Sequence, residues 1–173
     1  QKLCICTVLG RGCCVSLFFV VKYHYQKVCK NTEFRSDRVE IQRNAYLQQL
    51  IERKNNGMIK VITGIRRCGK SFLLFTIYKR YLLESGVDES HIIEIALDGI
   101  ENEELRDPKA CFQYVKERLT DGGHYYLLLD EVQFMPRFAE VLNSFLRMDH
   151  LDVYVTGSNS RFLSSDIVTE FRG

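Results

Sequence analysis

From Arg38 onward, the chain alternates between short apolar runs and longer segments whose apolar residues recur every three or four positions. The short runs indicate buried strands, and the longer segments indicate helices with one apolar face. The expected strands are residues 58–63, 91–97, 125–130 and 151–157, and the expected helices are residues 45–57, 70–86, 108–119 and 137–148. This alternation predicts an α/β fold with a parallel sheet that is flanked by helices.

The first 35 residues differ from this pattern and are interpreted as a separate segment, with the domain itself over residues 36–173. Residues 3–21 are almost wholly apolar and long enough to span a bilayer. Arg11 lies in the middle of this run, where a charge costs roughly 2.5–3.5 kcal/mol on membrane insertion. We therefore favour an appended segment that packs as a hairpin, or does not pack, over a membrane anchor.

The residues GIRRCGKS, from Gly64 to Ser71, satisfy the Walker A pattern and lie between an expected strand and an expected helix. Gly64 and Gly69 allow backbone N–H groups to approach phosphate closely. Lys70 can reach the β- and γ-phosphates, and the Ser71 hydroxyl can bind Mg²⁺. The predicted nucleotide-binding residues are Gly64, Ile65, Arg66, Arg67, Cys68, Gly69, Lys70, Ser71 and Phe72. For the two arginines, solvated side chains are favoured over phosphate contacts, and the field of the loop makes Cys68 a candidate for oxidation.

A second motif, YYLLLDEVQ at residues 125–133, is an apolar strand that ends in two acidic residues. At a strand's carboxyl end, Asp130 can support Mg²⁺ together with Ser71. Glu131 can orient or deprotonate an attacking water molecule. We therefore predict Asp130 and Ser71 as metal ligands and Glu131 as a catalytic base.

The last expected strand runs into small polar residues, VYVTGSNS at 153–160. Thr156, Ser158 or Asn159 can contact the γ-phosphate or the water, although a polar turn explains the same residues equally well. We select Asn159, because its amide can both donate and accept hydrogen bonds. The predicted catalytic set is therefore Glu131, Lys70 and Asn159.

Charge and cysteine content narrow the functional classes further. The net charge is +2, but five of the 24 Lys and Arg residues lie in the first 30 positions, which hold no Asp or Glu. The remaining chain carries 19 basic against 22 acidic residues, so its composition gives no evidence of nucleic-acid binding. Five of the seven cysteines also lie in that first segment and none forms a CxxC pair, which favours a reducing cytoplasm.

Together, KVITGIRRCGKSFLLF, YYLLLDEVQ and VYVTGSNSRFL resemble the ATPase domain of the prokaryotic AAA_14 family over roughly Arg38 to Gly173. The resemblance implies a P-loop NTPase of the additional-strand type, with sheet order 5-1-4-3-2 and a sensor strand between the two Walker strands. Only four strands are expected here, so the fifth strand and the helical lid would follow Gly173. The strand before the phosphate loop would then be an exposed edge. Family members commonly carry a carboxyl-terminal DUF4143 domain, so the chain is interpreted as a fragment.

The leading functional hypothesis is a domain that binds ATP and hydrolyses it with Mg²⁺. The alternative is an ATP-binding remnant or scaffold that does not hydrolyse ATP. Phosphoryl transfer to a small molecule and GTP switching have less support, since the N-K-x-D motif is absent. Expected partners are ATP, further copies of the chain or the family's carboxyl-terminal domain.

Overall fold

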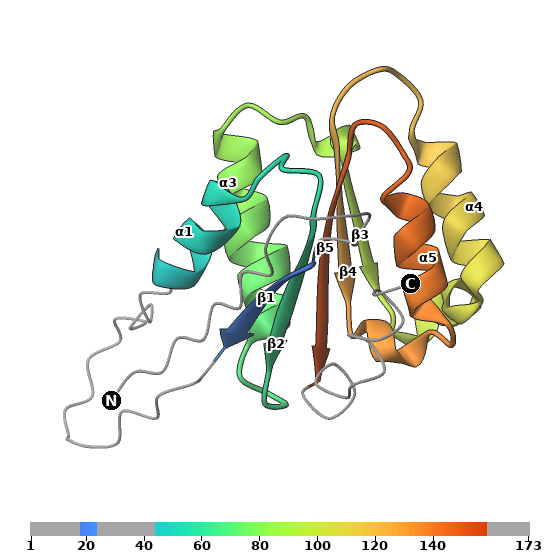
Figure 1. Cartoon of the computed structure of the whole chain (residues 1–173), viewed down its shortest axis with the longest axis horizontal. Helices are drawn as coiled ribbons and strands as arrows, with labels where there is room; N and C mark the ends of the chain where they lie inside the picture. The colour runs from blue at the N-terminus through green and yellow to red at the C-terminus, as the bar shows by residue number, and fades with distance from the viewer. Residues whose placement is uncertain (1–17, 24–43, 159–173) are drawn as a thin grey trace, which may run out of the picture.

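The computed structural model describes residues 18–23 and 44–158, which form a five-stranded parallel sheet with helices on both faces (Figure 1). The sheet has the order β1-β2-β5-β4-β3. Its strands are β1 (Phe18–Tyr23), β2 (Ile59–Gly64), β3 (Ile92–Ala96), β4 (Tyr125–Asp130) and β5 (Leu151–Ser158). The predicted α/β class is confirmed, and the four strands expected from the pattern form within one residue of their expected ends.

The helices alternate with these strands along the chain. One continuous helical segment follows β2, and its central part is π-helical. The helices are α1 (Asn44–Glu52), α2 (Lys70–Phe72), η1 (Leu73–Tyr78), α3 (Lys79–Glu84), α4 (Pro108–Arg118) and α5 (Phe138–Phe145), and the short 3₁₀ turns are η2 (Glu89–His91), η3 (Ile100–Arg106) and η4 (Val132–Phe134).

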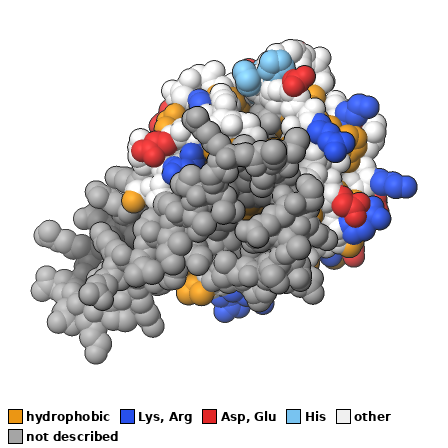
Figure 2. Space-filling model, in the orientation of Figure 1, with side chains coloured by type: hydrophobic (Ala, Val, Ile, Leu, Met, Phe, Trp, Pro, Cys, Tyr) orange, Lys and Arg blue, Asp and Glu red, His pale blue; other side chains and the backbone are white. Residues whose placement is uncertain are grey.

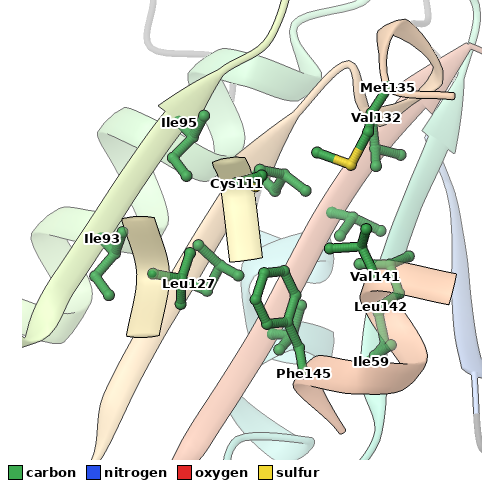
Figure 3. Packing of buried hydrophobic residues seen from close by; sticks show 14 of the residues in the cluster. Ile59, Ile93, Ile95, Cys111, Leu127, Val132, Met135, Val141, Leu142 and Phe145 are labelled. Atoms are coloured by element: carbon green, nitrogen blue, oxygen red, sulfur yellow. The ribbon is translucent and has the colours of Figure 1, made fainter. Parts of the chain in front are cut away.

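Each face of the sheet is covered by its own helices, and each has its own apolar core. On β4, Leu127 and Leu129 belong to the core beneath α4 and α5, whereas Tyr126 and Leu128 belong to the core beneath α1, η1 and α3. Figure 3 shows Phe145 of α5 directed toward the first of these faces. The alternation along one strand explains why β4 reads as a continuous apolar run.

Two helix boundaries follow from local signals that the sequence shows. The carboxylate of Asp107 accepts hydrogen bonds from the backbone N–H groups of Lys109 and Ala110, at 3.0 and 2.9 Å, so it caps α4. Gly86 has a φ of 87° and lies just after α3, where it allows the left-handed turn that ends the helix.

The first helix is shorter than predicted. α1 ends at Glu52, and not at Gly57, because the following residues turn away toward the sheet. Asn55 adopts a left-handed φ of 56°, and its backbone N–H donates to Asp152 at 2.9 Å. This contact over 97 positions fixes the turn, and no helical periodicity could reveal it.

The prediction that β2 would be an exposed edge is wrong. β1 pairs with β2 in parallel, with Val20 opposite Val61, and occupies that edge (Figure 1). A parallel pair needs a long crossover connection, which here contains α1. The local pattern of residues 3–21, which favoured a hairpin, therefore gave no sign that β1 pairs with β2. Of the apolar run at 3–21, residues 18–21 belong to β1, and residues 3–17 lie outside the described residues.

Two further observations concern the surface. Within residues 18–23 and 44–158, no helix is both long enough and apolar enough to cross a membrane. On the described surface visible in Figure 2, Lys and Arg side chains are interspersed with Asp and Glu side chains.

Candidate functional site

The glycine-rich motif and the acidic motif meet at the carboxyl ends of the parallel strands. All strands are parallel, so the carboxyl ends of β2, β5 and β4 lie side by side, and both motifs begin there. β5 lies between β2 and β4, as the resemblance implied for a sensor-bearing strand. The crevice outside the carboxyl ends of such strands is where open parallel sheets bind ligands.

The phosphate loop runs from Gly64, the last residue of β2, to Ser71 in α2. Gly69 has a φ of 91° and stands at the N-cap of α2, and Arg67 is also left-handed with a φ of 63°. Backbone that alternates between right- and left-handed residues turns its N–H groups toward a common centre, which suits an anion. The helical segment of 15 residues that follows adds the partial positive charge of its amino end.

The predicted loop side chains differ in exposure. Ile65, Arg66, Arg67 and Phe72 are exposed, whereas Cys68 and Lys70 are buried. The exposure of both arginines agrees with the solvated interpretation. Cys68 is 2% exposed and packs in the apolar core beneath α1 and η1, so its thiol is shielded from the oxidants to which we expected it to be sensitive.

Lys70 links the two motifs directly. Its ammonium lies 3.7 Å from Oε1 of Glu131, and 3.5 Å from the carbonyl oxygens of both Gly64 and Ile65. The side chain is 2% exposed, against 16% for Glu131. The cation therefore lies between the loop and the end of β4, within the region expected to hold phosphate.

Asp130 is the second point of contact between the motifs. Its carboxylate is 3% exposed and accepts hydrogen bonds from the hydroxyls of Thr156 on β5 and Ser71 in the phosphate loop. Burial raises the pKa of Asp130, although these two hydrogen bonds act in the opposite direction. The two predicted metal ligands are thus neighbours, from segments 59 positions apart.

These residues fit the coordination chemistry of Mg²⁺. This ion usually takes only one or two protein oxygens and completes its shell with water and substrate phosphates. The hydroxyl of Ser71 and the carboxylate of Asp130 supply such oxygens. Among residues 44–158, no group of three or more His, Cys, Asp or Glu residues could form a dedicated metal cage.

Glu131 follows Asp130 in a strained backbone conformation. Its φ is 53°, in the left-handed region that non-glycine residues seldom adopt. Its backbone N–H donates to Oγ1 of Thr156 at 3.0 Å, so Thr156 binds both acidic residues. Thr156 was one of three candidates after the fourth expected strand. Of the other two, Ser158 ends β5, and Asn159 lies outside the described residues.

One residue near the site was absent from the predicted set. The side-chain amide of Gln133 donates a hydrogen bond to Oε2 of Glu131. The sequence signal for it was only an amide two positions after the acidic pair, which has no meaning until the path of the turn is known.

The two cavities found elsewhere on the described part of the chain do not involve the predicted site residues. A groove of about 380 Å³ between α4 and α5 is lined by Phe112 and Val141 among others. A smaller cavity of about 230 Å³ lies at the amino ends of β2, β4 and β5, beside Asp152. The candidate site is defined by its converging polar groups, Lys70, Ser71, Asp130 and Glu131.

Comparisons with known proteins agree with this geometry. A sequence model of the AAA_14 family, described as an AAA domain, matches residues 56–173. An uncharacterized protein of Haemophilus influenzae is 34% identical over 134 residues, which is 77% of this chain and 33% of that protein. An uncharacterized protein of Methanocaldococcus jannaschii is 29% identical over 119 residues, which is 66% of this chain and 24% of that protein. The chain thus spans about a third or less of these curated relatives, and no solved structure matches it.

Proposed function

Because the chain belongs to the AAA_14 family of AAA domains, we propose that it binds ATP together with Mg²⁺ and hydrolyses the bond between the β- and γ-phosphates. One observation carries the proposal: Lys70 and Ser71 of the phosphate loop contact Glu131 and Asp130 from a strand that is not adjacent to β2. A glycine turn with an incidental lysine would not bring these four groups together.

Each of these groups has a distinct task in the proposed reaction. The loop N–H groups and the Lys70 ammonium bind the β- and γ-phosphates and stabilise their charge. The Ser71 hydroxyl and the Asp130 carboxylate hold the metal, and Mg²⁺ bound there supplies positive charge against the phosphate oxygens. The Glu131 carboxylate accepts a proton from the water that attacks the γ-phosphorus in line with the departing ADP.

The test is Mg²⁺-dependent phosphate release by the full chain and by Glu131→Gln. The variant removes the base but keeps the size of the side chain, so turnover should fall by about 10²- to 10⁴-fold, the usual contribution of a general base. Glu140→Gln makes the same change at an exposed position on α5 and should leave turnover unaltered. Equal turnover in the wild type and Glu131→Gln would exclude Glu131 as the base.

Nucleotide binding is measured separately, by titration with a fluorescent ATP analogue. Lys70→Ala should weaken binding strongly, because it removes the buried cation of the loop. Tight binding by the wild type without any turnover would support the alternative of a module that binds but does not hydrolyse ATP. Self-association, contact with a carboxyl-terminal domain and a cytoplasmic location stay predictions from the sequence.

A further inference from the structure

The chain reverses direction directly after Asp130, and this reversal brings Gln133 back to Glu131. Glu131 is left-handed, and the short turn η4 follows it, with the N–H of Phe134 donating to the Glu131 carbonyl oxygen at 3.1 Å. The Nε2 amide group of Gln133 then donates to Oε2 of Glu131. A backbone conformation that costs free energy is thus coupled to a side-chain contact on the proposed base.

The contact also leaves the oxygen atom of the Gln133 amide without a hydrogen bond from the described part of the chain, which costs stability. Oε1 of Gln133 is buried and has no hydrogen-bond partner among the described residues. Turning the amide over would not help, because its oxygen would then face the carboxylate oxygen of Glu131. An unsatisfied buried acceptor lowers stability, so an apolar side chain of the same size would suit this position better for folding alone. The neighbouring buried positions of the turn, Val132 and Met135, are apolar.

The contact fixes the carboxylate of Glu131 from the side opposite Lys70. Gln133 binds Oε2, whereas Oε1 lies 3.7 Å from the ammonium of Lys70. The backbone of Glu131 is held independently by Thr156. A glutamate has three rotatable side-chain bonds, so a bond at one oxygen restricts which direction the other oxygen faces.

We propose that Gln133 is a positioning residue, which holds Glu131 so that its second oxygen faces the region of Lys70 and the γ-phosphate. This inference rests on the proposed ATP hydrolysis. Gln133 would then support turnover and not nucleotide binding, and its unsatisfied oxygen would lower the stability of the fold.

The experiment compares Gln133→Met with the wild type in three measurements on the full chain: kcat, the Kd of a fluorescent ATP analogue and Tm. Methionine has nearly the same length but neither the donor nor the unsatisfied oxygen. We expect kcat to fall about 10- to 100-fold, as for other residues that orient a ligand or base. The Kd should change less than twofold, and Tm should stay equal or rise.

Gln113→Met is the matched control, because Gln113 also donates to a glutamate, Glu117, at 2.8 Å but on the exposed face of α4. It should change neither kcat nor Kd. A second variant, Gln133→Leu, also removes the donor without adding a charge beside Glu131, and it should reproduce the loss of kcat with nucleotide affinity retained.

The outcomes separate this inference from the function on which it rests. Full kcat in Gln133→Met, together with lost turnover in Glu131→Gln, overturns the role of Gln133 and leaves ATP hydrolysis standing. A fall in Tm with a matching loss of nucleotide affinity in both Gln133 variants shows a structural role and also overturns it. Absence of turnover in the wild type overturns both proposals.

Discussion

The carboxylate of Asp130 is one of the few charged groups that the sheet buries. It is 3% exposed, and burial raises its pKa, because the ionised form has lost contact with water. The hydroxyls of Thr156 and Ser71 compensate only in part. A carboxylate in this environment lowers the stability of the fold and, for the same reason, attracts a cation strongly.

We therefore expect Asp130→Asn to raise Tm by a few degrees in buffer without Mg²⁺ and nucleotide, since about 1 kcal/mol corresponds to about 2–4 °C in a chain of this size. Asparagine removes the buried charge but keeps an acceptor oxygen for the Thr156 hydroxyl. We also expect Mg²⁺ and ATP to raise the Tm of the wild type but not that of Asp130→Asn, as measured by differential scanning fluorimetry.

Asp149→Asn is the control for this measurement, because Asp149 is exposed and lies before β5, at the other end of that strand. It should leave both the basal Tm and the ligand-induced shift unchanged. A lower basal Tm for Asp130→Asn would show that its hydrogen bonds outweigh its desolvation.

Residue identities at the site were predictable to the extent that they depend on spacing. Lys70, Ser71 and Asp130 follow from two patterns whose chemistry requires those side chains at those positions. The hydrogen bonds of Thr156 and the contact of Gln133 with Glu131 were not predictable, because each depends on where the fold places one atom. No local pattern records that Glu131 is left-handed or that Gln133 faces it.

At the scale of elements, β2 and β5 are joined by a buried ion pair as well as by their backbone ladder. Lys60 of β2 is fully buried and binds Asp152 of β5, which also accepts from the hydroxyl of Tyr154 at 2.7 Å. Burial lowers the pKa of Lys60, whereas Asp152 counteracts this shift. The register of the two strands is thus supported by a charge pair near their amino ends as well as by backbone hydrogen bonds.

Removing one partner of such a pair leaves the other charge buried alone. We expect Lys60→Met to lower the free energy of unfolding by about 3–5 kcal/mol in urea denaturation. The double variant Lys60→Met, Asp152→Asn should recover part of this loss, because it leaves neither charge of the pair buried without its partner.

Lys79→Met provides the comparison, since Lys79 pairs with Glu94 at 2.6 Å and with Glu89 at 3.0 Å, but with 23% of its side chain exposed. Its loss should cost about 1 kcal/mol or less. Similar costs for Lys60→Met and Lys79→Met would contradict the importance of the buried pair.

For the molecule as a whole, the sequence predicted β2, β3, β4, β5 and their helices, because each carries its own periodicity and turn residues. It did not predict the edge strand β1. The pairing of β1 with β2 joins segments that are 41 positions apart, with Val20 opposite Val61. The local sequence of neither segment predicts which strand it pairs with. The helix α1 was overestimated for a similar reason, because the bond from Asn55 to Asp152 ends it.

The edge position of β1 makes a test on the backbone possible. In an edge strand, alternate N–H groups face the neighbouring strand, so only one of two adjacent residues donates to β2. Of Val20→Pro and Val21→Pro, we therefore expect one to lower Tm and increase aggregation and the other to have a smaller effect. Circular dichroism measures Tm and light scattering measures aggregation during the same thermal ramp. Equally mild effects of both variants would show that β2 does not need this cover.

β5 lies between β2 and β4 and is hydrogen-bonded to both, so it connects the two strands that lead into the predicted nucleotide motifs. A shift of this strand by one residue would move Thr156 by about 3.3 Å and turn its hydroxyl away from Asp130. A displacement of β5 relative to its neighbours would therefore change the alignment of β2, which leads into the glycine-rich loop, and of β4, which ends at Asp130, in one movement.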